Sequence, residues 1–161
     1  MKKSYFDAWA AEIIAAREPL NFTQTQRFVE LLYEVDEVVS IEVGYVLFHL
    51  FTDGEDNGVK QHVVCLLSGY PVYEYYRSLL LALPEMLKQC LVNDWPYSAA
   101  DYWGRDLQDG DLGELLRAYF DSTAEEKESF LKIILSQAFF HDHSWPAEFI
   151  KLVRKREKNG I

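Results

Sequence analysis

The chain is poor in residues that cross-link small proteins or bind transition metals, with two Cys, two Met and four His among 161 residues. Cys65 and Cys90 stand alone, without a CxxC pair and without a His at metal-ligand spacing. Each falls inside an apolar periodic segment, where Cys is usually buried. We therefore expect two buried, reduced thiols, and the disulfide-rich and Cys-rich metal-binding classes are excluded.

Long hydrophobic runs are also absent. The longest stretch without Asp, Glu, Lys or Arg covers residues 61–73, which is shorter than the roughly 20 apolar residues that cross a bilayer. The first three residues resemble the start of a secretion signal, but Asp7 and Glu12 interrupt the apolar run that such a signal needs. We expect a soluble protein without an export signal.

The motifs of common enzymes are missing, including the G-x-S-x-G elbow, the P-loop, G-x-G-x-x-G and H-E-x-x-H. His141, Asp142 and His143 are three potential metal ligands, but adjacent residues point apart and a zinc site needs convergent ligands. Nearby carboxylates in one loop do not define the separation that a glycosidase pair requires. We expect no enzyme, no catalytic residue, no cofactor and no metal.

The turn "TDGEDNG", residues 52–58, resembles the start of a calcium loop because Asp53, Glu55 and Asn57 alternate. An EF-hand needs Asp or Asn at its third position and a bidentate Glu at its twelfth. Those positions hold Glu55 and Val64 here, and a Val supplies no oxygen ligand. The sequence therefore predicts a polar turn between two helices and no calcium site.

Basic residues are outnumbered, with 16 Lys and Arg against 26 Asp and Glu and a net charge of −10. Residues 34–59 contain seven acids and no Lys or Arg, and residues 101–114 contain five acids and one Arg. Residues 145–161 reverse the sign, with five basic residues and two acids. Because nucleic-acid binding requires a basic face, this distribution argues against direct contact with DNA or RNA.

Helical periodicity is present almost everywhere, and no segment shows sustained strand alternation. Hydrophobic residues make up 49% of the chain and aromatic residues 15%, which is typical of a packed globular protein. We expect one all-α domain over residues 1–161 with eight to ten helices. The expected helices cover residues 5–18, 23–37, 41–52, 59–67, 71–83, 84–92, 98–106, 112–120, 124–139 and 145–158.

Several residues predict where helices begin. Thr23 with Gln26, and Thr123 with Glu126, form capping-box patterns, while Ser40 precedes a helix that is apolar on almost every side. Pro84 and Ser144 are expected to begin further helices, and His49 is expected to be a hydrogen-bonded core histidine. The short connections make neighbouring helices antiparallel, and residues 59–92 have the length of one HEAT-like pair. The expected architecture is an irregular α-solenoid of three to four such pairs.

Residues 74–107, "EYYRSLLLALPEMLKQCLVNDWPYSAADYWGRDL", carry a family resemblance. The features are the Tyr76-Arg77 start, the Leu79–Leu83 run into Pro84–Leu87, the downstream Trp95 and the closing Arg105-Asp106-Leu107. This stretch resembles the immunity protein 30 family, HEAT-like helical immunity proteins of bacterial polymorphic-toxin and contact-dependent growth inhibition systems. The resemblance implies a cytoplasmic, non-catalytic protein that binds the toxin domain of a neighbouring cell.

The acidic charge offers a physical basis for that binding. Electrostatic attraction steers an acidic protein towards a basic nuclease, where it competes with nucleic acid for the basic surface. We expect a 1:1 complex in which the protein covers the active site or substrate groove of the toxin. The alternative functions are an acidic DNA mimic or helical regulator that binds a basic protein, and a scaffold subunit with a large apolar patch. Trp95 and Trp103 are expected in the core, whereas Tyr97 and Tyr102 fit either the core or the interface. The predicted contact residues are Asp53, Glu55, Asp56, Tyr97, Tyr102, Asp106, Asp109 and Asp111.

Overall fold

The computed structural model describes residues 2–54, 58–92, 94–102, 107, 109–136, 139 and 143–159, with the backbone alone described at Asp109. The predicted all-α class is confirmed, because these residues form nine helices and no strand. Among the described helices, none combines the length and apolar character that crossing a membrane requires. The helices are α1 (Lys3–Ala15), α2 (Phe22–Tyr33), α3 (Ile41–Phe48), α4 (Val59–Ser68), α5 (Val72–Gln89), α6 (Trp95–Ala100), α7 (Asp109–Phe120), α8 (Ala124–Ile134) and α10 (Trp145–Lys158).

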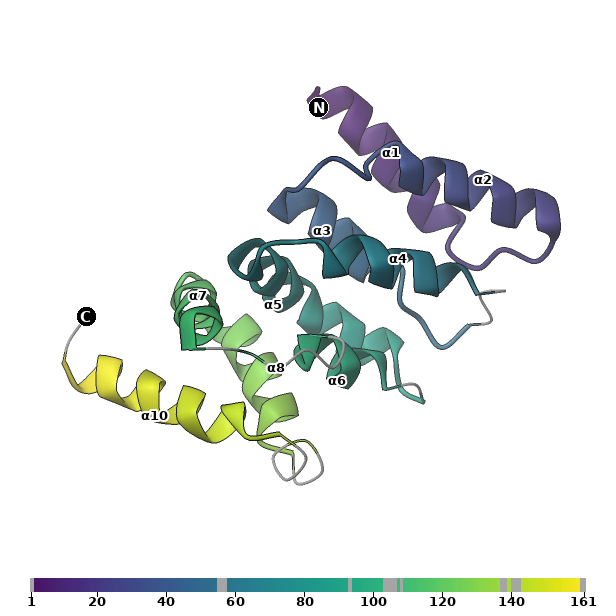
Figure 1. Cartoon of the computed structure of the whole chain (residues 1–161). Helices are drawn as coiled ribbons and strands as arrows, with labels where there is room; N and C mark the ends of the chain where they lie inside the picture. Colours follow the sequence, from purple (N-terminus) through teal and green to yellow (C-terminus); the bar gives the residue numbers. More distant parts are fainter. Residues whose placement is uncertain are drawn as a thin grey trace.

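The helices follow one another through the molecule, from the α1–α2 pair at one end to α10 at the other (Figure 1). Helix α5 lies in the middle and contacts α3, α6, α7 and α8. Its side chains Tyr75 and Tyr76 are completely buried and donate hydrogen bonds to the carbonyl oxygens of Ala99 and Ala100, at 2.8 and 3.1 Å. These two bonds fix α6 against α5. The HEAT-like repeat character of the stack stays a prediction.

Helix α5 continues through Pro84, where the sequence predicts a break. A proline inside a helix removes one backbone hydrogen bond and costs about 3 kcal/mol. Leu83 and Met86 are both buried beside it, with exposed fractions of 0% and 1%. Burying one such side chain contributes about 1.5–3 kcal/mol, so the packing of both sides of Pro84 outweighs the lost bond. The expected division into 71–83 and 84–92 is wrong for this reason.

Among the described helices, side-chain caps are found at the starts of α2, α3 and α8, and two of these three caps were predicted. Ser40 accepts a hydrogen bond from the backbone N–H of Val43, and Thr123 and Glu126 form a capping box. Helix α2 is capped by Asn21, whose side chain accepts from the N–H of Gln24. The predicted Thr23 cap is wrong because Asn, a strong cap, stands two residues earlier. Ser144 is also not a side-chain cap, since its own backbone is helical.

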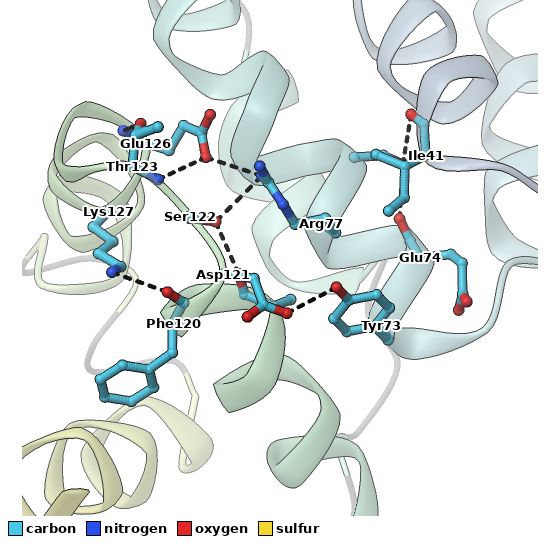
Figure 2. A network of polar contacts seen from close by, with 12 residues as sticks. Ile41, Tyr73, Glu74, Arg77, Phe120, Asp121, Ser122, Thr123, Glu126 and Lys127 are labelled. Atoms are coloured by element: carbon cyan, nitrogen blue, oxygen red, sulfur yellow. Dashed lines mark hydrogen bonds and ion pairs between the residues drawn. The ribbon is translucent and has the colours of Figure 1, made fainter. Parts of the chain in front are cut away.

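A network of polar contacts joins α5 to the connection between α7 and α8 (Figure 2). The Arg77 guanidinium donates to the Glu126 carboxylate at 2.9 Å and to the Ser122 hydroxyl at 3.3 Å. The side chains of Arg77 and Glu126 are only 16% and 8% exposed. At the edge of this network Tyr73 donates to Asp121 at 2.8 Å. The capping box of α8 is therefore tied directly to the central helix.

Candidate functional site: a loop edge

Three helix connections lie on one side of the molecule, at the right of Figure 1. They are residues 16–21 between α1 and α2, taken together with Phe22 at the start of α2, residues 49–54 after α3, and residues 90–92 with 94 between α5 and α6. We call these residues the loop edge. Loops carry binding residues more often than the elements that they connect, particularly when a rigid scaffold positions them.

Asp53 connects two of the three loops. One oxygen of its carboxylate accepts hydrogen bonds from the backbone N–H groups of Leu91 and Val92, at 2.6 and 2.9 Å. These N–H groups belong to residues that follow the end of α5 and are not part of that helix. Asp53 was predicted to contact a partner, and it also has this structural role. The second and third loops are consequently fixed to each other.

Contacts from the end of α1 fix the first loop to the second. The Thr52 hydroxyl donates to the Glu18 carboxylate at 2.7 Å, and Thr52 is 5% exposed. The Arg17 guanidinium lies 3.4 Å from the carbonyl oxygen of His49. His49 itself is a partly buried histidine whose Nδ1 lies 3.0 Å from the Tyr45 carbonyl oxygen, which confirms its predicted hydrogen bond. The three loops thus form one connected surface.

A buried lysine holds the turn that resembles a calcium loop. Lys60 is 2% exposed, and its ammonium donates to the carbonyl oxygens of Thr52 and Gly54 at 2.8 and 2.7 Å. A cation of the chain itself therefore binds carbonyl oxygens of this turn. Sequence reasoning missed this residue, although Lys60 shares a helical face with the buried Val63 and Leu67. A Lys at an apolar position of an amphipathic helix is the signal that could have found it.

Four apolar side chains of the loop edge point into solvent. Leu20 and Phe22 are 83% and 81% exposed, and Leu91 and Val92 are 79% and 83% exposed. Single exposed apolar residues are common on protein surfaces, but groups of them mark interaction sites. Here they come in two pairs, on loops that hydrogen bonds hold together. The loop edge therefore combines apolar contact area with a fixed backbone.

A cavity of about 460 Å³ adjoins the loop edge through Asp94. His143 Nδ1 lies 2.9 Å from an oxygen of Asp101, and the Phe139 ring centre lies 4.4 Å from that of His143. Carboxylates and aromatic rings thus share the walls of this cavity. The lining residues are Asp94, Tyr97, Ser98, Asp101, Ser136, Phe139 and His143.

The structure separates the two tyrosines that were predicted as interface anchors. Tyr97 lines the cavity and is partly exposed. Tyr102 is 5% exposed and donates a hydrogen bond of 2.8 Å to the Tyr70 carbonyl oxygen, so it belongs to the core. Trp95 is partly buried and packs against the core, with its ring centre 5.0 Å from that of Phe51, so its predicted core position is confirmed only in part. Tyr97 is therefore the one predicted anchor that a partner can contact.

The predicted acids do not all lie together. Asp36 and Glu37 precede α3 and Asp53 follows it, so the acidic segment 34–59 is divided between the two ends of that helix. Asp101 and Asp111 both lie close enough to the Tyr76 hydroxyl to raise its pKa, after the larger effect of burial. Other residues of the sequence predictions lie outside the described residues. They are Glu55, Asp56, Trp103, Asp106, His141, Asp142 and the side chain of Asp109.

The two thiols differ in their surroundings. Cys90 is 8% exposed and its thiol lies 3.2 Å from the Phe51 carbonyl oxygen. Burial raises the pKa of Cys90 to about 11, with a further contribution from Asp53. Cys65 is exposed on α4, so the prediction of two buried thiols is wrong for it. The face of α4 that packs into the core carries Val59, Val63 and Leu67, and Cys65 lies on a different face.

Within the described part of the chain, no group of three His, Cys, Asp or Glu side chains is placed to hold a metal ion. Comparisons with protein-family models, with curated proteins and with solved structures find no match to this chain.

Proposed function

We propose that this chain is an immunity protein that binds a basic toxin domain through the loop edge and thereby blocks its active site or substrate groove. The observation that carries the proposal is the set of four apolar side chains, each about four-fifths exposed, in two of three loop segments that are joined by hydrogen bonds. Interfaces draw most of their binding energy from a few apolar or aromatic contacts that lose water on association. Leu20, Phe22, Leu91 and Val92 are suited to that role.

The fixed loops favour binding for a second reason. A loop that must become ordered on association loses conformational entropy, at about 0.5–1.5 kcal/mol for each immobilised side chain. Asp53 and Lys60 hold the loop backbones before any partner arrives. A larger share of the contact energy therefore remains for affinity.

The cavity beside the loop edge suits a basic side chain of the partner. Asp94 and Asp101 place carboxylates on its walls, and Tyr97 and Phe139 add aromatic rings. Carboxylates pair with a guanidinium, and aromatic rings stack on it. An arginine can therefore interact with both the acidic and the aromatic residues that line the cavity. His143 already occupies one side of Asp101, which leaves Asp94 as the more accessible acid.

The family resemblance and the net charge of −10 support the choice of a basic toxin domain, and a nuclease is the partner class that they favour. A DNA mimic, the alternative from the sequence, requires carboxylates spread along one face. The acids Asp36 and Asp53 lie at opposite ends of α3, and the last helix is basic. The immunity function is therefore preferred.

The experiment uses the toxin domain encoded next to this chain, purified together with it. In the first variant, Leu91→Ser is combined with Val92→Ser, which removes apolar area and keeps the backbone N–H groups that bind Asp53. The control is Val39→Ser, a change of a 48% exposed residue that precedes α3 on the opposite side. We expect the double variant to bind about tenfold more weakly, equivalent to about 1.4 kcal/mol, and the control to bind like wild type. Equal affinities for all three proteins would contradict the proposal.

A further inference from the structure

The last two helices carry a second surface with the opposite charge. Two hollows of about 570 and 540 Å³ adjoin each other at Leu135, one along α10 and the other along α8. We call the joined hollows the basic groove. Its lining residues are Ala124, Lys127, Glu128, Leu131, Lys132, Leu135, Ser136, Ala147, Ile150, Lys151, Arg154, Lys155 and Lys158. Six of these are cations and one is an acid, in a chain whose net charge is −10.

The helical period explains why α10 contributes four cations to one side. Lys151, Arg154, Lys155 and Lys158 follow the three- and four-residue spacing that places side chains on one helix face. Another face is buried in the core through Phe149 and other apolar residues. The α10 helix is therefore amphipathic, with one apolar face in the core and one cationic face in solvent.

Among the described residues, four of the six cations have neither a hydrogen bond nor an ion pair. Lys151 pairs with Glu148 at 3.2 Å, and Lys127 lies 3.3 Å from the Phe120 carbonyl oxygen. Within the described residues, the cations without a hydrogen bond or ion pair are Lys132, Arg154, Lys155 and Lys158. These charges are available to an anionic ligand.

The floor of the basic groove is apolar. Leu135 is 53% exposed at the point where the two hollows meet, and Leu131 and Ile150 are partly exposed on either side of it. A ligand that fills this groove must therefore present both apolar groups and anionic groups. That combination distinguishes the candidate ligands from one another.

We propose that the basic groove binds an acidic amphipathic segment of a protein partner, with its apolar side chains on Leu131, Leu135 and Ile150 and its carboxylates towards Arg154, Lys155 and Lys158. An amphipathic helix in a groove is a recurrent mode of peptide recognition, in which apolar anchors repeat every three or four residues. A nucleic acid supplies phosphates but no aliphatic groups for the floor. Single-strand binding also relies on aromatic stacking platforms, and the described residues that line this groove include no aromatic residue.

The probe for this proposal is a labelled synthetic helix of about 18 residues, with Leu along one face and Glu on the others. Two matched peptides separate the two requirements, because one replaces Glu by Gln and the other replaces Leu by Ser. The protein variants are Arg154→Glu with Lys155→Glu, and Leu135→Ser, each at an exposed position. The control is Lys88→Glu on α5, a single charge reversal at a residue that is 63% exposed and lies outside the groove.

Anisotropy titrations should show saturable binding of the acidic Leu peptide that weakens about tenfold with either peptide change or either groove variant. The Lys88→Glu protein should bind like wild type. Equal affinity of the acidic Leu peptide for the wild-type protein and for the groove variants would overturn the proposal. Tighter binding of a single-stranded DNA of similar length would contradict the proposal and identify the groove as a nucleic-acid site. Tighter binding of phosphatidylserine vesicles would contradict it and identify a membrane-binding surface. Dimerisation that blocks the peptide would identify a second copy of the chain as the occupant. Because no loop-edge residue is involved, these results are independent of the proposed immunity function.

Discussion

Lys60 makes two hydrogen bonds to the described part of the acidic turn. Its side chain is buried, and its ammonium donates hydrogen bonds to the Thr52 and Gly54 carbonyl oxygens. Burying a charge is unfavourable unless hydrogen bonds compensate for the lost water, and these two short bonds supply that compensation. A residue that is usually found on the surface thus acts as part of the core.

The first prediction concerns Lys60→Met, which preserves the length of the side chain and removes its three donors. We expect the free energy of unfolding to fall by about 1–3 kcal/mol, because the two carbonyl oxygens lose their partner. Urea denaturation measures this change. Lys88→Met, at an exposed position, should stay within about 0.5 kcal/mol of wild type. Equal stability of the two variants would show that the turn does not need its internal cation.

The second prediction concerns the two thiols. At about pH 8 an aromatic disulfide reagent should modify the exposed Cys65 rapidly and Cys90 only when the protein unfolds, because burial raises the pKa of Cys90 to about 11. In the Cys65→Ser variant the rapid reaction should disappear. A fast reaction that remains in Cys65→Ser would contradict the buried position of Cys90.

The same pKa shift has a consequence for stability. The Cys90 thiol has an ordinary pKa of 9.0, and the folded protein raises it to about 11. The native state then retains a proton that the unfolded state releases, so this stabilisation is complete below about pH 9 and is lost as the pH rises through 11. A Cys90→Ala variant should show a smaller loss of stability over this alkaline range.

At the scale of single elements, Glu126 at the start of α8 has two structural roles. Its carboxylate closes the capping box with Thr123 and also pairs with Arg77 of the central helix. Loss of a cap costs about 1 kcal/mol, whereas removing one partner of a buried ion pair costs about 3–5 kcal/mol because the other charge stays buried and unpaired. The two roles can therefore be separated by mutation.

The third prediction follows from this difference. Thr123→Ala should lower the free energy of unfolding by about 1 kcal/mol, and Glu126→Ala by about 3–5 kcal/mol. Combining Glu126→Ala with Arg77→Met should recover part of the loss, since no buried charge then remains. Thermal or urea unfolding of the three variants provides the comparison. If Glu126→Ala costs no more than Thr123→Ala, the ion pair does not stabilise the contact between α5 and α8.

The sequence predicted the helices well where local signals act alone. The caps at Ser40 and at Thr123 with Glu126 are examples, because the cap, the first turn and the apolar period all lie within a few residues. The prediction failed where two local signals compete, as for Asn21 and Thr23. It also failed at Pro84, where tertiary packing overrides a local helix breaker.

The candidate site was harder to predict than the helices. Charge in the sequence pointed to Asp53, but its hydrogen bonds to Leu91 and Val92 join residues that are 38 and 39 positions apart. The apolar residues of the loop edge gave no signal, because an exposed Leu in a loop has no periodic neighbour. Such features depend on which loops the fold brings together, and a single sequence does not record that.

For the whole molecule, the distribution of charge follows the order of the helices. The acidic segments 34–59 and 101–114 both precede α8, and the basic groove belongs to α8 and α10. A basic partner is therefore attracted to the part of the molecule before α8 and repelled from the last helix, and such steering weakens as salt increases. The two proposed surfaces can act on different partners at the same time.

The measurement that tests the central claim most directly is amide hydrogen exchange of this chain, alone and in complex with the toxin domain encoded beside it. Complex formation buries backbone and slows exchange where the partner sits. We predict slower exchange in residues 16–22, 49–54 and 90–94, with unchanged exchange in residues 36–42 and in α10. Protection confined to 36–42 or to α10, or the absence of any complex with that domain, would contradict the account.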